Sequence, residues 1–232
     1  KNRDSEELDM MSELFIQAVP KIELIPPPAA KEVYLERVND RTADREDAIY
    51  ALVHFARMDM GSAHSEAEAK SCLKKVVSLV RKCVDSDPSM GETAAIVFLK
   101  CGGMCEAVNY YYSALWLYEG SMLFESSDPN VRYFQHNNLG FCLNYFKQFA
   151  EAESYLVFAT KILPHRYNAW KNLGVSLEHQ ACYREAAESY LRAITEGHAE
   201  SRSAKHLFRL LDRHPELLKI PEIMAHIPAA RA

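Results

Sequence analysis

The chain has 232 residues and a formal net charge of −5, with 48% hydrophobic and 25% charged residues. These values are typical of a globular protein and exclude bulk disorder, because such a chain can bury a sizeable core. Both signs of charge are spread along the sequence, whereas a nucleic-acid-binding protein usually gathers Lys and Arg on one face. Only eight glycines are present, so a sheet protein built on many tight turns is not expected.

The apolar runs and the cysteines indicate whether the chain enters a membrane and whether it forms disulfides. The longest purely apolar run, residues 94–99, is far shorter than the roughly 20 residues that a membrane-spanning helix needs. Most of the six cysteines occupy apolar positions of helical patterns, where a free thiol behaves as a small hydrophobic group. A secreted disulfide framework would be smaller and richer in loops. We therefore expect a cytoplasmic protein with no membrane insertion.

Residues 1–41 are predicted to form an N-terminal helix and a proline-rich extended arm. Apolar residues recur at helical spacing from 4 to 19, where a proline ends the pattern. Residues 20–30 include three consecutive prolines, which favour an extended polyproline conformation. The apolar residues of this arm suggest docking on an apolar surface, and the sequence leaves open whether the arm occupies a binding groove.

Residues 42–130 are predicted to form diverged helical hairpins. Apolar residues at helical spacing predict a helix from 42 to 60. Ser65 and Glu68 form a capping-box pattern, in which each side chain satisfies a backbone N–H at the start of a helix. This pattern predicts a second helix that begins after Ser65 and runs to about Val84.

A diverged repeat is expected on residues 90–117. Helical patterns lie on both sides of Gly102-Gly103, so these two glycines are expected to form an internal turn. The next helix is expected to overrun the regular period, because Tyr133 comes later than that period allows.

Residues 131–200 contain an internal repeat. The segment 137–140, Asn-Asn-Leu-Gly, aligns with the segment 171–174, Lys-Asn-Leu-Gly, and the two glycines are 34 residues apart. Other positions agree in the same register: Leu143 with Leu177, Ala152 with Ala186, Leu156 with Tyr190, and Ala159 with Ala193. Small residues at such positions allow two helices to cross closely, while larger residues fill the space between the crossings.

This pattern resembles the tetratricopeptide repeat, a pair of antiparallel helices with a period of 34 residues. The resemblance implies an all-α fold of stacked antiparallel helical hairpins, an α-solenoid with a right-handed superhelix. It covers two full repeats, in residues 131–200. Residues 201–232 are then expected to form a terminal capping helix, which covers the last apolar face, and a tail that three prolines fragment.

The resemblance also implies a binding surface. In this family the first helices of successive repeats line a concave groove that binds peptides or partner proteins. In this sequence those helices are residues 133–145 and 167–179. Together with two residues of the capping helix, their side chains not needed for packing are expected to line the groove: Asn137, Asn138, Phe141, Tyr145, Lys171, Asn172, Val175, His179, Lys205 and Arg209.

Two features of this set bear on the ligand. Asn138 and Asn172 are equivalent, and the pair resembles an asparagine ladder that some members of the family use to hold a peptide backbone. Lys205 and Arg209 fall where a third repeat would place the basic pair of a carboxylate clamp, although the other three clamp positions are not matched. The alternatives are that asparagine is common at this position whatever the ligand, and that the capping helix is simply solvated. The basic residues favour an acidic partner.

The sequence contains no pattern for catalysis. It has neither a Walker-type phosphate loop nor a glycine-rich dinucleotide turn. Cys101 and Cys105 have three residues between them instead of the two that are usual for zinc or redox pairs, and no second pair follows. We expect no catalytic residue, no cofactor, no metal site and no nucleic-acid partner.

The sequence therefore predicts a module for protein–protein interaction that binds a peptide or partner protein in the groove. Phe141 and Tyr145 are the expected anchors, with Lys171 supplying charge. Two alternatives stay open. The chain could be a self-associating structural scaffold, or it could be the regulatory domain of a larger enzyme.

Overall fold

The computed structural model describes residues 30–39, 45–61, 63–197 and 201–230, and all of its regular elements are helices. The helix expected at residues 4–19 and nearly all of the arm expected at 20–30 lie outside these residues. The chain divides into two compact units, residues 1–126 and 127–232, and each is described by itself. No helix in the described ranges is long and apolar enough to cross a membrane.

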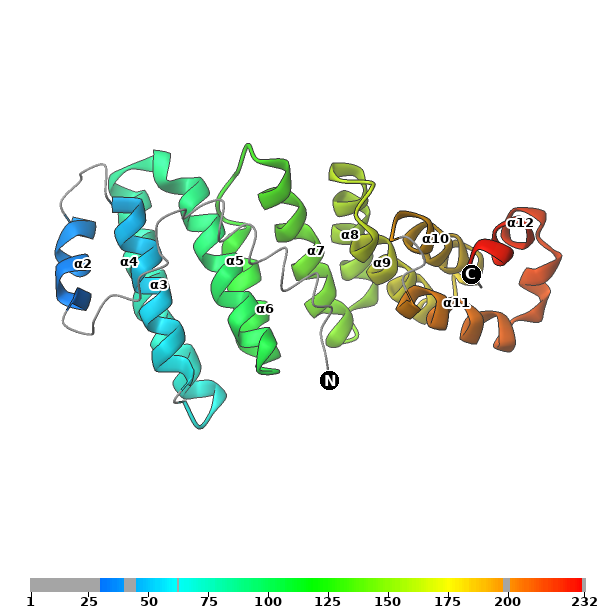
Figure 1. Cartoon of the computed structure of the whole chain (residues 1–232), viewed down its shortest axis with the longest axis horizontal. Coiled ribbons are helices and arrows are strands. Elements are labelled where there is room, and N and C mark those ends of the chain that lie inside the picture. Colours follow the sequence, from blue (N-terminus) through cyan, green and yellow to red (C-terminus); the bar gives the residue numbers. More distant parts are fainter. Residues whose placement is uncertain (1–29, 40–44, 62, 198–200, 231–232) are drawn as a thin grey trace. The chain divides into compact units, whose positions relative to one another are not determined.

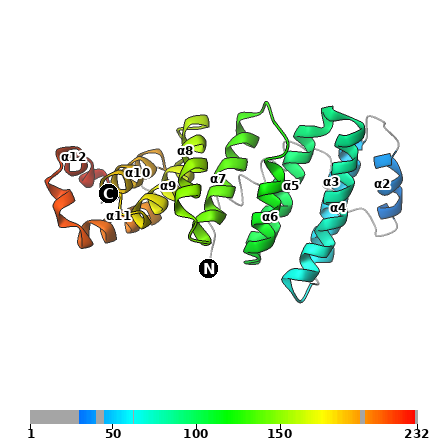
Figure 2. The ribbon, with the colours of Figure 1, turned by 180° about the vertical axis from the view of Figure 1, so that it is seen from behind.

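The first unit is a series of helices in which successive members pack together. Figure 1 and, from behind, Figure 2 show α3 beside α4 and α5 beside α6. Large side chains such as Ile49, Leu73 and Phe98 are fully buried between these helices. The elements are α2 (Ala30–Asn39), α3 (Arg45–Gly61), α4 (Glu66–Ser86), the 3-10 turn η1 (Pro88–Met90), α5 (Gly91–Ala107) and α6 (Tyr111–Ser121).

The start of α4 confirms the predicted cap. The Ser65 side chain accepts a hydrogen bond of 3.2 Å from the backbone N–H of Glu68. The Glu68 carboxylate accepts one of 2.8 Å from the backbone N–H of His64, one residue before the position expected for a capping box. Side chains thus satisfy two backbone N–H groups at the N-terminus of α4.

The turn predicted at Gly102-Gly103 is wrong, because α5 runs through both glycines. The chain turns instead at 108–110, where Asn109 has a left-handed φ of 64°. Gly102 is needed for close helix packing and not for a turn. A Cβ at this position would lie 2.4 Å from Cε1 of Tyr118, so the missing side chain permits α5 and α6 to approach.

The second unit contains the two full repeats. Consecutive helices pack against each other, and α7 also contacts α9. The elements are α7 (Pro129–Tyr145), α8 (Phe149–Ile162), α9 (Tyr167–His179), α10 (Tyr183–Glu196), α11 (Ser201–Arg213), the 3-10 turn η2 (Pro215–Lys219) and α12 (Pro221–Ala230). The predicted capping helix is α11. The expected helical overrun before Tyr133 is absent, because α6 ends at Ser121 and residues 122–128 are not helical.

The tail is also more regular than expected. Pro215 begins η2 and Pro221 begins α12, since proline at the first helical position lacks only an N–H that would have no partner within the helix. The helix α12 continues to Ala230 and packs against α10. Prolines therefore start these elements instead of fragmenting the tail.

Three hairpins share one internal geometry: α5–α6, α7–α8 and α9–α10. In each, a glycine lies against the side chain 16 positions later, and an added Cβ would approach that side chain to 2.4–2.6 Å. The pairs are Gly102 with Tyr118, Gly140 with Leu156, and Gly174 with Tyr190. Seven positions after the glycine comes a left-handed turn residue; these residues are Asn109, Lys147 and Ala181. The hairpin α5–α6 is therefore built like the two full repeats.

Candidate protein-binding surface

The predicted site residues lie on α7, α9 and α11, the first helices of successive hairpins, and the structure separates them by exposure. Asn137, Asn138 and Asn172 are buried, with exposed fractions of 1%, 6% and 5%. The remaining residues are half-buried or exposed: Phe141, Tyr145, Lys171, Val175, His179, Lys205 and Arg209.

The three buried asparagines bind one another. The amide Nδ2 of Asn172 donates to Oδ1 of Asn137 at 3.1 Å, and Nδ2 of Asn137 donates to Oδ1 of Asn138 at 3.0 Å. Polar groups in the interior need such partners, because burying them without hydrogen bonds is costly. These amides thus join α7 to α9 and take part in the packing of the two helices.

A second polar link between α7 and α9 involves Asn144. Its Nδ2 donates to the backbone carbonyl of Asn172 at 2.8 Å, and its Oδ1 accepts from the Ser176 hydroxyl at 2.7 Å. Sequence reasoning did not identify this link. The signal was the hydroxyl of Ser176 at a small, buried position of α9.

An apolar and aromatic strip runs across α7 and α9. Phe141 and Val175 each follow the glycine of their repeat by one residue, and Tyr145 and His179 follow it by five. Phe141 and Val175 are half-buried, Tyr145 is 55% exposed, and the exposed His179 ring stacks on Phe149 with a centroid distance of 4.3 Å. Because α7 packs against α9, equivalent positions on the two helices form one surface, which we call the α7–α9 strip.

Lys171 lies on the same side of α9 as Val175 and His179. Its Nζ donates to Oδ1 of Asn168 at 3.1 Å and lies 5.9 Å from the centroid of the Tyr167 ring. Asn168 is only 1% exposed, and its Nδ2 has no hydrogen-bond partner within the described ranges.

The predicted basic pair lies on α11 near a carboxylate of the chain itself. Lys205 and Arg209 are exposed, and Nη2 of Arg209 lies 2.9 Å from Nδ1 of His206. Arg213 and Tyr190 both donate hydrogen bonds to the Glu178 carboxylate, with Tyr190 at 2.7 Å.

These contacts determine the charge of Glu178. Burial raises the pKa of its carboxyl, but the hydrogen bonds from Tyr190 and Arg213 and the charges of Arg213 and Arg209 hold the pKa below its ordinary value of 4.5. Glu178 is therefore ionised at neutral pH and already neutralises part of this basic end.

The cysteine pair on α5 has the environment of packing residues. Cys101 and Cys105 are both fully buried. Burial, helped by the mutual charge of the two sulfurs, raises the pKa of the Cys101 thiol, and burial with the nearby charge of Glu66 raises the pKa of the Cys105 thiol to about 12. Both thiols are therefore protonated at neutral pH, the form that is neither nucleophilic nor metal-binding.

No protein-family model matches the chain, and no curated protein is significantly similar to it in sequence. Several solved structures share its fold. The structure of YrrB, described as a TPR protein with an unusual peptide-binding site, superposes with a TM-score of 0.54 and 16% identity over 87% of this chain and 92% of YrrB. A MamA protein superposes with a TM-score of 0.52 and 15% identity over 77% of this chain and 90% of MamA.

A third structure, MamA from Desulfovibrio magneticus RS-1, gives a TM-score of 0.51 and 13% identity over 78% of this chain and 95% of that one. Identities of this size show the fold alone. Together with the repeated glycine contacts and turn residues, they confirm the resemblance that the 34-residue period indicated. The chain has the all-α fold of stacked hairpins found in tetratricopeptide-repeat proteins.

Proposed function

We propose that the chain is a protein-interaction module, without enzymatic activity of its own, that binds a partner polypeptide along the α7–α9 strip. The observation that carries this proposal is that exposed or half-buried aromatic and apolar side chains occupy equivalent positions of two packed helices. Tyr145 is 55% exposed, and Phe141 and Val175 lie beside it on the same surface. Aromatic side chains at a surface supply much of the binding energy in protein interfaces, because they bury a large area at low entropic cost.

The charges near the strip favour an acidic segment in the partner. Lys171 lies on the same side of α9 as the strip, and Lys205 and Arg209 are exposed on α11. A carboxylate of the partner would form charge-assisted hydrogen bonds with these groups. The peptide-binding site described for YrrB is in keeping with a polypeptide ligand on this fold.

The experiment selects ligands from a library of random 12-residue peptides displayed on phage and titrates the selected peptides by fluorescence polarisation. The test variant is Phe141→Ala/Lys171→Ala, which removes one aromatic and one cationic group from the surface. The matched control is Phe158→Ala/Lys161→Ala, because α8 carries an exposed phenylalanine with a lysine 5.8 Å from its ring centroid.

We expect the selected peptides to be rich in acidic and apolar residues. The test variant should bind them at least about tenfold more weakly than the wild-type chain, the loss usual for truncated anchor residues, and the control should bind them normally. If the test variant bound the peptides as tightly as the wild-type chain, with an unchanged circular dichroism spectrum, the α7–α9 strip would be excluded as the binding surface. Sedimentation at several protein concentrations separates this function from the self-associating scaffold, which would give a mass that rises with concentration.

A further inference from the structure

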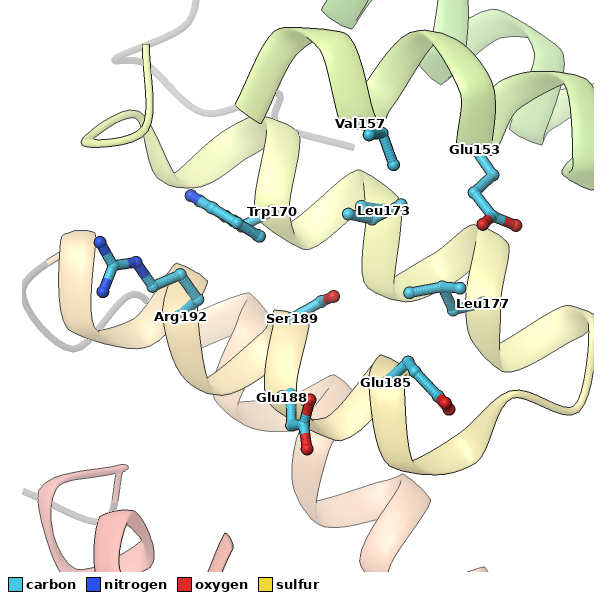
Figure 3. A pocket seen from close by; sticks show the side chains of 9 residues that line it. All are labelled: Glu153, Val157, Trp170, Leu173, Leu177, Glu185, Glu188, Ser189 and Arg192. Carbon is cyan, nitrogen blue, oxygen red and sulfur yellow. The ribbon is translucent and has the colours of Figure 1, made fainter. Parts of the chain in front are cut away.

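A pocket lies on the opposite side of α9 from the α7–α9 strip. With 3.6 residues per turn, Trp170, Leu173 and Leu177 fall on one side of the helix, while Lys171 and Val175 fall on the other. The pocket has a volume of about 570 Å³ and lies between α8, α9 and α10, as Figure 3 shows. Its lining residues are Glu153, Val157, Trp170, Leu173, Leu177, Glu185, Glu188, Ser189 and Arg192.

The lining combines an apolar wall with an excess of negative charge. The apolar wall consists of the α9 side chains and Val157, and three carboxylates come from α8 and α10. Arg192 is the single basic residue of the lining, and it pairs with Glu196 at 2.8 Å while its guanidinium lies 5.9 Å from the Trp170 ring centroid.

The three carboxylates differ in the hydrogen bonds that they accept from other residues of the chain. Glu153 accepts a hydrogen bond of 2.7 Å from Gln180, and Glu188 accepts one of 2.9 Å from Arg184. Glu185 is exposed, and its carboxylate accepts no hydrogen bond from any residue that the structure describes. Negative charge therefore remains available at the α10 side of the pocket.

The hydroxyl of Ser189 belongs to the pocket lining. Ser189 is 6% exposed, and its Oγ has no hydrogen-bond partner in the described part of the chain. Figure 3 shows this Oγ directed toward the side of the pocket that Leu173 and Leu177 form. Because Ser189 lines the pocket and its hydroxyl has no partner within the described residues, this oxygen can accept a hydrogen bond from a ligand.

The preceding hairpin shows what normally fills this place. The residues of α7–α8 equivalent to Trp170, Ser189 and Arg192 are His136, Tyr155 and Phe158, each 34 positions earlier. There the rings of Tyr155 and Phe158 pack on His136, with centroid distances of 5.9 and 5.4 Å. The hairpin α9–α10 has serine and arginine where α7–α8 has two aromatic rings, so the rings that pack on His136 have no counterpart beside Trp170.

From these observations we infer that the pocket binds a lysine or arginine side chain of a partner polypeptide. The apolar stem of that side chain would lie along Leu173, Leu177 and the Trp170 ring, as long basic side chains do on apolar surfaces. Its cationic head would lie near Glu185 and Glu188, and the Ser189 Oγ would accept one of its N–H groups. The site is independent of the α7–α9 strip, because it uses the other side of α9.

The test uses the indole N–H signal of Trp170 in a ¹H–¹⁵N spectrum of the full chain. The chain contains two tryptophans, so a Trp116→Phe variant assigns the signal. The probes are four blocked tripeptide amides with leucine on both sides of lysine, arginine, norleucine or glutamate. We expect lysine or arginine peptides to shift the Trp170 signal saturably, at least about tenfold more tightly than the norleucine and glutamate peptides, and less tightly at high salt.

Two variants separate the pocket from the general charge of the chain. Glu185→Gln/Glu188→Gln should weaken the basic peptides at least about tenfold, while Glu151→Gln, which changes the position equivalent to Glu185 in the preceding hairpin, should leave the binding unchanged. Ser189→Tyr, which introduces the residue of that hairpin, should abolish the shift. Equal shifts with all four peptides, no shift with either basic peptide, or normal binding by the double variant would overturn the inference.

Discussion

Gly102 on α5 lies against the ring of Tyr118 on α6, so closely that a Cβ at position 102 would be 2.4 Å from Cε1 and 2.7 Å from Cδ1 of that ring. Tyr118 is fully buried and its hydroxyl donates to Glu106 at 2.6 Å, so the ring has little room to move. We therefore expect Gly102→Ala to lower the free energy of unfolding by about 1–3 kcal/mol, the usual cost of overpacking, despite the better helix propensity of alanine. Urea unfolding monitored by circular dichroism measures the change.

The control for this substitution is Gly91→Ala, at the start of the same helix. A Cβ at Gly91 would lie 3.9 Å from the nearest atom outside its helix, the carbonyl oxygen of Glu125, which is ordinary contact. The free energy of unfolding should change by less than about 0.5 kcal/mol, as for most surface substitutions. Equal destabilisation by both substitutions would show that helix α5 does not need a close approach at Gly102.

The asparagine cluster gives a prediction that separates a packing role from a binding role. Asn172→Ala removes the donor to Asn137 Oδ1 and leaves that buried oxygen without this partner. We expect a loss of about 1–3 kcal/mol in the free energy of unfolding. Lys171→Ala, next to it and half-buried, should cost less than half as much. If Asn172→Ala weakened a selected peptide without changing stability, the amide would be a ligand group after all.

The lowered pKa of Glu178 leads us to expect that the stability of the fold depends on pH. Because its folded pKa lies below 4.5, its ionised form stabilises the fold above the ordinary pKa, and this contribution is lost as the pH falls through the folded pKa. Glu178→Gln should therefore reduce the loss of unfolding free energy between about pH 6 and about pH 3. Urea titrations at both pH values measure it. An unchanged pH dependence in the Glu178→Gln variant would contradict this role of Glu178.

The cysteines should differ sharply in reactivity. Cys182 is exposed, whereas Cys83, Cys101, Cys105 and Cys142 are buried. Brief treatment with iodoacetamide at neutral pH should modify Cys182 first and leave Cys101 and Cys105 unmodified, because burial raises the pKa of both thiols and keeps them protonated. Mass spectrometry of tryptic peptides identifies the modified sites. Rapid modification of Cys105 in the folded chain would contradict its raised pKa.

Much of the fold was predictable because the repeat depends on residue size at fixed spacing. Gly140 and Gly174, with Ala152 and Ala186, identify helix crossings without any knowledge of the structure. The hairpin α5–α6 was harder to recognise, since two adjacent glycines usually indicate a turn and residues 122–128 lengthen the spacing to the next repeat. A signal was present nonetheless: Glu106 and Tyr118 are 12 residues apart, like Glu178 and Tyr190, and both pairs form the same hydrogen bond.

The candidate site was predictable only in part. Helical spacing placed Phe141, Tyr145 and His179 outside the core, and in the structure Tyr145 and His179 are exposed while Phe141 is half-buried. It could not show that Asn137 and Asn172 meet, because that depends on the distance between two helices separated by a whole hairpin. The pocket beside Ser189 was missed for a related reason: the empty space results from the size of side chains on three helices, and no single periodicity contains it.

The residue four positions after the repeat glycine connects each first helix of the second unit to the next one. In α7 this residue is Asn144, which binds the backbone of Asn172 and the hydroxyl of Ser176 on α9. In α9 it is Glu178, which binds Arg213 on α11. Exchanging the two hairpins in the chain would consequently separate both residues from their present partners. A permuted gene encoding them in reverse order would have to encode matching residues in the following helix as well.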